Sequence, residues 1–412
     1  MEGPLEGIRV LDFGQAAACP VIGWVLAGLG ADVIKIEKLE GEAMRWGLSP
    51  EGVHWSREPK KEDPTEWMSF NPGKRALAIN LKQDKGKEII TKLIHTTDVL
   101  IHNSRPGVMA RLGLDYKSVS QINPMIVYLN VYGYGEEGPL VHKVSGDSWI
   151  QALSGIVSLQ GTPNGGPYLA GPCVVDHITA MSGVAGVLAA LVAREKIGSG
   201  QEIVTSLLNG AIFLQHVELN DYLIDGKLQK KVGRGWRGAF PYGPYKAKDG
   251  DVSTFHGAGP DWKAFCQVLG LTHLLNNPRY ETQELREVYK EELYPILDEA
   301  FSKKTRDEWH EEFEKAGLRV EPALDYVELL AHPQFEANCM LDEVDHPKRG
   351  KIKMVTIPTK LRKTPGGLRR AAPLLGQHTK EILGEIGYSA EEVTELTQAG
   401  VVRVSEVSPR SR

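Results

Sequence analysis

One carboxylate in this sequence stands directly ahead of a long apolar run. Asp176 lies near the end of the small-residue stretch YLAGPCVVDH and is followed by ITAMSGVAGVLAALVARE, which we expect to form a buried helix over residues 178–194. An Asp at the start of such a helix is typical of an N-cap, whose oxygen accepts the first free amide hydrogens. A carboxylate is also a nucleophile toward activated acyl groups. Position alone favours the cap.

The cysteines offer little competing chemistry. Cys19, Cys173, Cys266 and Cys339 are scattered, with neither a C-x-x-C pair nor a histidine at zinc-ligand spacing. We therefore expect neither a structural metal nor a disulfide framework. Cys173 stands three residues before Asp176 and is an alternative nucleophile, although a lone cysteine among small apolar residues more often serves packing.

Three predicted loops carry basic or amide side chains that suit a phosphate-bearing ligand. They are a lysine after the run DVIKIE, the turn FNPGKR, and the segment HNSRPGVMARLG, which starts a helix just after a predicted strand. Charge-assisted bonds to phosphate are strong, so we expect a multiply phosphorylated ligand here. For any one residue alone, a solvated surface position is the alternative. The candidates are Lys38, Asn71, Lys74, Arg75, Asn103, Arg105 and Arg111.

The elements that must position these side chains alternate between strands and helices. We expect strands over residues 8–13, 32–37, 76–80, 99–102 and 125–132, and a helix over residues 85–95. This is the pattern of an α/β, doubly wound parallel sheet, which binds ligands at the carboxyl ends of its strands. The turn GQAAACP after the first strand lacks the glycines of a dinucleotide site, and the sequence has neither a P-loop nor a nucleophile elbow.

The chain is long enough for two or more domains. Its 412 residues are 42% hydrophobic and 25% charged, as in ordinary globular proteins. A hairpin turn at Asp249-Gly250 and helices over residues 261–269, 284–301 and 306–315 indicate a smaller second domain. We expect a large domain over 1–215, a linker over 216–235, a small domain over 236–322, a linker over 323–345 and the rest of the large domain over 346–412.

Charge and hydropathy exclude two classes of partner. A net charge of -5 and a pI near 6.2 argue against a nucleic-acid surface, which needs a basic face. Met1 is followed by Glu2 rather than by a basic and then apolar leader, and no apolar run approaches the length that spans a bilayer. We expect a cytoplasmic protein without a membrane partner.

The order of motifs along the chain resembles the class III CoA-transferases, the CaiB/BaiF family that includes formyl-CoA:oxalate and carnitine CoA-transferases. The resemblance runs from Leu5 to about Val402. Each motif is weak alone, but they follow in order: PLEGIRVLDF, LGADVIKIE, FNPGKRALAINLK, RPGVMARLG, GYGEEGP, QALSG, the Asp176 segment and APLLGQHTKEILGEIGY.

The resemblance implies that Asp176 is the nucleophile of a CoA-transferase of the EC 2.8.3 type. Its carboxylate would pass through an aspartyl anhydride and an aspartyl-CoA thioester, and amide hydrogens after it would stabilise the oxyanion. Coenzyme A would be part of the substrate rather than a permanently bound cofactor. By the resemblance Lys38, Asn71, Lys74, Asn103 and Arg111 would contact it, and we add Arg75, Arg105 and Lys143 to that set.

The resemblance also implies an architecture and two departures from it. A Rossmann-like large domain would carry a smaller inserted α+β domain, and two chains would interlock as a homodimer. The family has a glutamine where this chain has Ala17, and a glycine run over the active site where this chain has GRGWRG (233–238). Trp236 and its flanking arginines would either shape an anion-seeking pocket or form a plain linker.

Two other functions remain open. The 2-methylacyl-CoA racemases share the fold and pair an Asp with a His in a G-H-D stretch, where this chain has Ser145, Gly146 and Asp147; His142 and His177 lie nearby in sequence. A CoA-binding subunit of a heteromeric CoA-transferase is the second alternative. Whether the chain is a complete CoA-transferase or one subunit of a heteromeric one, the expected ligands are an acyl-CoA and a carboxylic acid.

Overall fold

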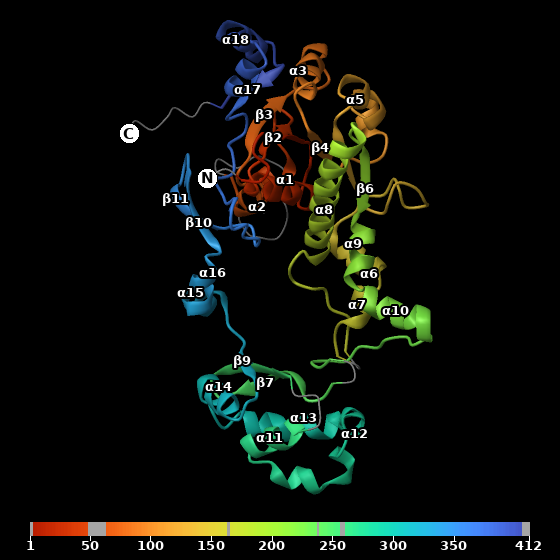
Figure 1. Ribbon diagram of the computed structural model, residues 1–412, viewed down its shortest axis with the longest axis vertical. Coiled ribbons are helices and arrows are strands. Elements are labelled where there is room, and N and C mark those ends of the chain that lie inside the picture. The colour runs from red at the N-terminus through yellow and green to blue at the C-terminus, as the bar shows by residue number, and fades with distance from the viewer. Residues whose placement is uncertain (1–2, 48–62, 163–164, 237–238, 256–259, 406–412) are drawn as a thin grey trace. The chain divides into compact units, whose positions relative to one another are not determined.

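The computed structural model describes residues 3–47, 63–162, 165–236, 239–255 and 260–405, and it separates into two compact units (Figure 1). The first unit comprises Met1–Ser154, Ala170–Leu219 and Cys339–Arg412. The second comprises Gly155–Leu169 and Asn220–Asn338, and so extends beyond the expected small domain at both ends. The insertion of one unit into the sequence of the other leaves the first unit discontinuous along the chain.

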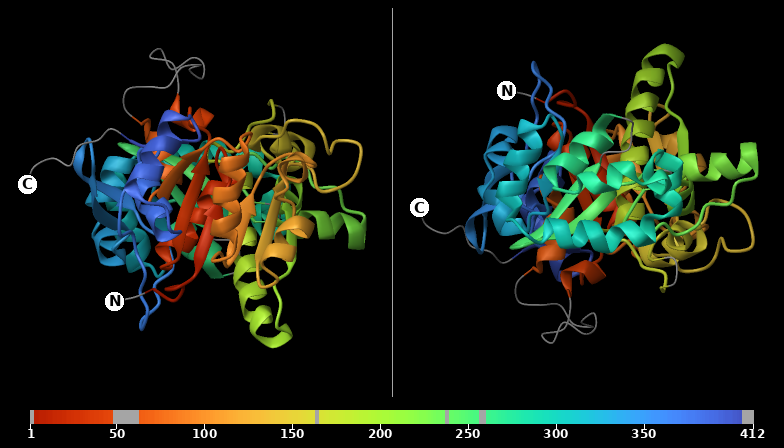
Figure 2. Two further views of the ribbon diagram at one scale, coloured as in Figure 1. Left: turned by 90° about the horizontal axis from the view of Figure 1, so that it is seen from above. Right: turned by 90° about the horizontal axis from the view of Figure 1, so that it is seen from below.

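A seven-stranded sheet forms the centre of the first unit. Its order is β12-β3-β2-β1-β4-β5-β6, with β1 to β6 parallel and β12 antiparallel to β3. Figure 2 shows its red and orange strands side by side. The order 3-2-1-4-5-6 is that of a doubly wound sheet, so the α/β Rossmann-like prediction is confirmed. The strands are Arg9–Asp12, Asp32–Glu37, Arg75–Ile79, Val99–His102, Val127–Tyr132, Glu202–Ser206 and Val402–Arg403.

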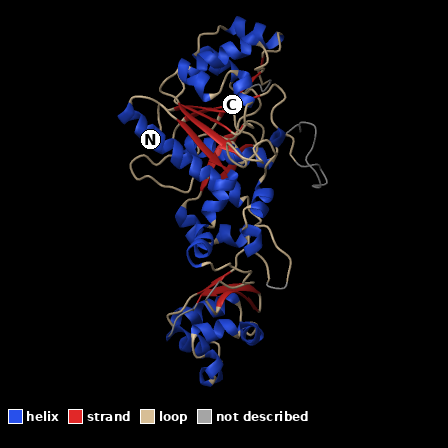
Figure 3. Ribbon diagram, turned by 90° about the vertical axis from the view of Figure 1, so that its right-hand side faces the viewer, coloured by secondary structure: helices blue, strands red, loops and turns tan. Residues whose placement is uncertain are grey.

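Helices cover both faces of this sheet, as Figure 3 shows by separating helices from strands. One face packs against α3 (Asp84–Ile94), α5 (Tyr116–Ile122), α17 (Thr379–Glu385) and α18 (Ala390–Gln398), whose apolar side chains join a single buried cluster. The C-terminal segment therefore completes the core of the unit that the N-terminal segment begins.

The other face is covered by α1 (Ala18–Gly28) and the long helix α8 (Val174–Ile197). Gly183 of α8 lets the two helices approach closely, because a Cβ there would lie 2.6 Å from the Ile22 side chain. Within the described part of the chain, α8 is the one helix long and apolar enough to cross a membrane by length and composition. Its packing on α1, α9 (Leu207–Leu214) and the sheet is that of a core helix.

Shorter elements complete the first unit. A 3-10 turn over Ala43–Arg45 and α2 (Thr65–Phe70) follow β2, and the strands β10 (Leu341–His346) and β11 (Gly350–Val355) pair as an antiparallel hairpin. The unit also contains α4 (Val108–Leu112) and α6 (Asp147–Leu153), and α10 (His216–Asp225) begins in it and continues into the second unit.

The second unit is α+β, as predicted. The strands β7 (Tyr242–Ala247), β8 (Gly250–Phe255) and β9 (Val320–Pro322) form an antiparallel sheet, and the expected hairpin joins β7 to β8. The helix expected over 306–315 is α14 (Arg306–Lys315), whereas that expected over 284–301 is two helices that meet at Tyr289. The remaining helices are α7 (Ile156–Leu159), α11 (Pro260–Val268), α12 (Gln283–Val288), α13 (Lys290–Phe301), α15 (Tyr326–Ala331) and α16 (Pro333–Asn338).

Candidate active site

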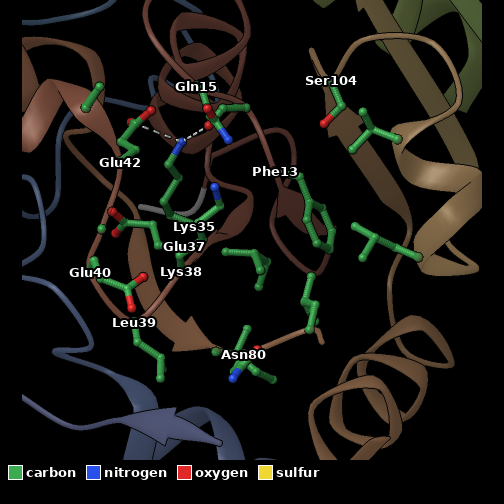
Figure 4. Close-up of a pocket in the computed structure, with 18 of the residues that line it drawn as sticks. Phe13, Gln15, Lys35, Glu37, Lys38, Leu39, Glu40, Glu42, Asn80 and Ser104 are labelled. Carbon is green, nitrogen blue, oxygen red and sulfur yellow. Dashed lines mark hydrogen bonds and ion pairs between the residues drawn. The ribbon is translucent and has the colours of Figure 1, made fainter. Parts of the chain in front are cut away.

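A pocket of about 660 Å³ opens at the carboxyl ends of the first four parallel strands (Figure 4). This is the switch point between β1 and β4, where strand order reverses and doubly wound sheets bind their ligands. Apolar side chains line part of it, and lysines line another part. The apolar residues include Phe13, Ile36, Leu81, Met109 and Leu112, the lysines are Lys35, Lys38 and Lys82, and three glutamates, Glu37, Glu40 and Glu42, also line it.

Lys38 and Lys82 are exposed at the pocket, which suits them to meet phosphate groups. Lys38 follows β2 as the sequence predicted, and Lys82 follows β3 and was not among the expected residues. The pocket thus combines an apolar wall that suits a flat base with two exposed lysines that suit anionic groups, and its lining also carries the carboxylates of Glu37, Glu40 and Glu42. These are the features that a nucleotide-bearing ligand requires.

Beneath the pocket lies a buried network of charges. The Lys74 ammonium donates to Asp12 Oδ2 at 2.7 Å, to the Pro20 carbonyl at 2.8 Å and to Asn71 Oδ1 at 2.8 Å. Burial lowers the pKa of Lys74 to about 8, although Asp12 opposes that shift. Lys74 and Asn71 are fully buried. The sequence predicts direct contact of both residues with CoA. The structure instead places them in the core beneath the pocket, where their side chains are buried.

Lys35 extends the network to the pocket floor. It donates to the Gly14 carbonyl and lies 3.5 Å from Glu42 Oε1, and Figure 4 shows it reaching toward Glu42 and the loop at Gln15. Burial lowers the pKa of Lys35, but Asp12 and Glu42 outweigh that effect and raise it. Lys35 therefore carries its charge and holds the loop after β1 against the loop after β2.

Arg75 also differs from its expected role. Its guanidinium contacts Asp32 at 2.5 Å, Glu381 at 2.8 Å and, in addition, Glu385. Arg9, at the start of β1, contacts the same Asp32 and Glu385, so Arg75 reaches toward the amino ends of the strands rather than toward the pocket. Arg75 ties the C-terminal helix α17 to the sheet.

The other expected CoA ligands divide into a loop clamp and exposed cations. Asn103 accepts from the Gln15 backbone N–H at 2.8 Å and donates to the Gln15 carbonyl at 2.7 Å, which fixes the loop after β1. Arg105, Arg111 and Lys143 are exposed. Asn103 thus shapes the pocket, and the three cations remain available to a ligand.

Asp176 lies in the first turn of α8 and is not its N-cap. The helix begins at Val174, and Cys173 occupies the N-cap position. The Cys173 side chain makes no capping hydrogen bond to the helix. Instead Asp147, the first residue of α6, accepts the Val175 N–H at 2.8 Å and the Asp176 N–H at 3.1 Å on Oδ2. The N-cap prediction for Asp176 is wrong because a carboxylate from another helix fills that role.

The same geometry removes the expected oxyanion site. The Val174 N–H bonds the Pro172 carbonyl at 2.7 Å and the His177 N–H bonds the Cys173 carbonyl at 3.1 Å, while Asp147 takes the two amides between them. No amide hydrogen of this turn is left to stabilise an oxyanion, so the expectation that the helix start does so is wrong.

The surroundings of Asp176 make it a poorly solvated carboxyl. Burial raises its pKa to about 6, the Asp147 charge adds to that shift, and His177 opposes it. Burial and the same two carboxylates raise the pKa of the Cys173 thiol. A thiol held in its protonated form is a weak nucleophile, so the arrangement favours Asp176 over Cys173.

The ligand atoms of Asp147, Cys173 and Asp176 lie within 4.8 Å of one another, the one such group among the residues that the structure describes. Both Asp147 oxygens are already hydrogen-bonded, to Gln151 and to the two amides. The two amides occupy both lone pairs of Asp147 Oδ2.

The residues considered for the alternatives are also accounted for. The His177 ring bonds the Cys173 carbonyl at 2.7 Å through Nδ1, and His142 is exposed. Arg234 donates to both Asp298 oxygens at 2.8 and 2.9 Å and lies over the Tyr294 ring at 4.0 Å, so it braces the second unit. Trp236 of the expected glycine-rich cover is 51% exposed and its ring contacts the Tyr242 ring, whereas residues 237–238 of that cover lie outside the described residues.

The chain is similar in sequence to known CoA-transferases along nearly its whole length. The chain is 33% identical over 401 residues to the human succinyl-CoA:glutarate CoA-transferase, covering 97% of this chain and 90% of that protein. It is 30% identical over 424 residues to the formyl-CoA:oxalate CoA-transferase of Streptomyces coelicolor, covering 97% and 99%.

A solved structure and a family model extend the likeness to the fold. A CAIB/BAIF family protein from Brucella suis superposes with a TM-score of 0.83 at 28% identity, covering 94% of this chain and 100% of that one. The model described as CoA-transferase family III matches residues 5–379. The chain therefore belongs to CoA-transferase family III.

Proposed function

We propose that this CoA-transferase uses Asp176 as the nucleophile that carries CoA from a donor thioester to an acceptor carboxylic acid. The observation that carries the proposal is the Asp176 carboxyl itself. Its pKa is raised to about 6 by burial and by Asp147, so it is ionised at neutral pH yet poorly hydrated. Such a carboxylate is a stronger nucleophile than one in water, because less hydration must be removed before attack.

The reaction proceeds through four displacements, each of which breaks one bond to an acyl carbon and forms another. Asp176 attacks the donor thioester and gives an aspartyl anhydride, and the CoA thiolate leaves. The thiolate attacks the Asp176 carbonyl, gives an aspartyl-CoA thioester and releases the donor acid. The acceptor carboxylate then attacks the aspartyl carbonyl of this thioester, which expels the CoA thiolate and gives a second anhydride. The thiolate attacks the acceptor's acyl carbon in that anhydride, which gives the acceptor-CoA thioester and releases the Asp176 carboxylate. The thioester bond energy is conserved throughout.

The pocket at the switch point supports a place for the nucleotide part of CoA. Phe13, Met109 and Leu112 offer an apolar wall to the base, and Lys38 and Lys82 offer charge to phosphate groups. Arg105, Arg111 and Lys143 are exposed cations that we include in the proposed binding surface. CoA enters and leaves as part of the substrate, without a permanently bound cofactor.

The named relatives suggest which acids to test first. The human and mouse relatives are named for succinyl-CoA and glutarate, and the Agrobacterium fabrum relative is named for succinate and glutarate. We propose succinyl-CoA as donor and a dicarboxylate of glutarate size as acceptor. Formyl-CoA and oxalate, for which the Streptomyces relative is named, are the second pair.

We further propose that two chains form a homodimer in the cytoplasm. Large apolar side chains stand exposed on α9 and at the start of α10, with Phe213 61%, Leu214 45% and Val217 46% exposed. Contiguous exposed apolar side chains are typical of a subunit interface. Size-exclusion chromatography with light scattering checks the stoichiometry. An active homodimer would exclude the hypothesis that the chain is a subunit that needs a different partner chain.

One assay tests the proposed reaction. The purified protein is incubated with succinyl-CoA and a panel of carboxylates, and the CoA products are identified by mass spectrometry. Transfer to glutarate or a similar diacid is the expected result. Exchange of the α-hydrogen of a 2-methylacyl-CoA with deuterated solvent, without transfer to any free acid, would instead establish the racemase.

A further inference from the structure

Asp147 joins two helices at the reacting carboxyl. It begins α6, and its Oδ2 accepts the backbone N–H groups of Val175 and Asp176 at 2.8 and 3.1 Å. Its carboxylate thus occupies the N-terminal end of α8, where a helix favours negative charge. These bonds hold the backbone of Asp176 in place, because its own amide is one of the two donors.

Gln151 connects the same carboxylate to the segment that leads to Asp176. Its Nε2 donates to Asp147 Oδ1 at 2.5 Å, and its Oε1 accepts the Ala170 N–H at 2.9 Å. Gln151 is only 1% exposed. A hydrogen-bonded chain therefore runs from Ala170 through Gln151 and Asp147 to Asp176, and it ties α6 to both ends of the segment 170–176 that leads into α8.

We propose that Asp147 is the positioning residue of Asp176 and that its fixed negative charge makes the Asp176 carboxylate a stronger nucleophile. The inference rests on the proposed role of Asp176. The charged or titratable groups near Asp176 are Asp147 on α6 and Cys173 and His177 on either side of it. Two carboxylates this close repel each other, so the Asp176 carboxylate is more basic than an isolated one.

The repulsion has a direction that helps the first displacement. When Asp176 attacks the donor, its negative charge leaves with the CoA thiolate, and the neutral anhydride no longer faces a like charge at Asp147. The first step thus relieves electrostatic repulsion that the free enzyme contains. The aspartyl-CoA thioester is neutral at Asp176 as well and gains the same relief.

Asp147→Asn removes the charge and keeps the two bonds to the α8 amides, although its Nδ2 group cannot accept from Gln151 Nε2. The Asn carbonyl oxygen accepts the two α8 amides as the carboxylate does, because Asn is as good a helix cap as Asp, but the charge is gone. Asp115→Asn is the matched control, since it removes one charge at the start of α5, where Asp115 bonds Ser118. Asp147→Ser provides a second neutral cap in case the Asn variant does not fold.

The experiment follows the titration of Asp176 by carbon-13 NMR of the carboxyl signals in substrate-free protein, with Asp176→Asn identifying the signal. In the Asp147 variants the midpoint should fall by roughly 0.5 unit or more, since a like charge has been removed. Asp115→Asn should leave it in place. An unchanged midpoint in folded Asp147→Asn and Asp147→Ser overturns the inference.

Kinetics then separate the inference from the proposed function. The acid limb of transfer should shift to lower pH in Asp147→Asn, and the plateau kcat should fall about tenfold as the nucleophile weakens, with KM for acyl-CoA unchanged. If the Asp176 midpoint shifts in Asp147→Asn but the wild type transfers no CoA, only the proposed function is refuted. An active wild type with an unshifted titration refutes the positioning role alone.

Discussion

The Lys74 ammonium donates to the Asp12 carboxylate at 2.7 Å, and both side chains are fully buried. Asp12 ends β1 and Lys74 precedes β3, so the pair joins two strands on either side of β2. Gly23 of α1 leaves the room for it, since a Cβ there would lie 2.6 Å from Asp12 Oδ2. The floor of the pocket is thus built from charge rather than from apolar packing.

Removing one member of this network should destabilise the fold strongly. Asp12→Ala leaves two ammonium groups, Lys35 and Lys74, without the carboxylate that lies between them, and breaking a buried pair costs about 3–5 kcal/mol. Urea unfolding followed by circular dichroism measures the loss. Glu6→Ala removes an exposed pair with Arg369 and should cost roughly 0–1 kcal/mol. A loss of that small size in Asp12→Ala would contradict the network.

The sequence predicted the parallel core well because its strands are continuous apolar runs. Asp32–Glu37 and Val99–His102 have the expected bounds, and nearly every residue in them is buried. Glu202–Ser206 and Val402–Arg403 were not expected. The first is a partly exposed edge strand and the second is only two residues long, so neither produces the buried run that identifies a central strand.

The site was harder to predict because proximity to a strand does not tell where a side chain points. FNPGKR places Lys74 and Arg75 side by side in sequence, yet one is buried under β1 and the other reaches Asp32 and Glu385. Successive side chains of a strand point to opposite faces, which is why neighbours separate. Asp147 was read only as the racemase counterpart, although its spacing from Gln151 would have suited a hydrogen bond within α6.

The basic side of the pocket should act on CoA affinity. Lys38→Ala removes a charge-assisted bond to phosphate, which should raise KM for acyl-CoA about tenfold and leave kcat near its wild-type value. Leu112→Trp should raise KM as well, because the larger side chain fills the apolar wall. Steady-state kinetics with varied acyl-CoA measure both. Lys85→Ala removes an exposed lysine that pairs with Glu88 on α3 and should leave KM unchanged.

The nucleophile should be identified by chemical trapping. Wild-type protein incubated with succinyl-CoA and then hydroxylamine should gain a hydroxamate on the peptide that contains Asp176, because hydroxylamine cleaves anhydrides and thioesters at that carbonyl. Asp176→Asn should show neither the label nor transfer, whereas Cys173→Ala should keep both. A label on Cys173 or Asp147, or substantial transfer by Asp176→Asn, would refute the proposed mechanism.

Transfer should rise with pH through the titration of Asp176. Only the ionised carboxylate attacks the thioester, and burial with help from Asp147 raises the pKa of Asp176 to about 6. The rate under kcat/KM conditions should therefore follow a single ionisation with a midpoint near that value. An acid limb centred near the ordinary Asp value, about 4, would show that Asp176 is well solvated in the free enzyme.

The same ionisation should appear in the stability of the protein, with the opposite sign. Because the folded pKa of Asp176 is raised to about 6 from 3.8, the folded state holds an extra proton between these values, and stability is lost as pH rises through them. Asp176→Asn carries no charge and escapes this loss. The variant should therefore match the wild type near about pH 4 and be more stable above about pH 6.5 by on the order of 1 kcal/mol, a value reduced for partial exposure. Thermal or urea unfolding across that range measures the difference.

Asp325→Asn changes an exposed cap that bonds the Val327 and Glu328 amides, and it should show no such gain. If Asp176→Asn were less stable than the wild type at high pH, the carboxylate would be stabilising α8, and the picture of a nucleophile held under electrostatic repulsion would fail.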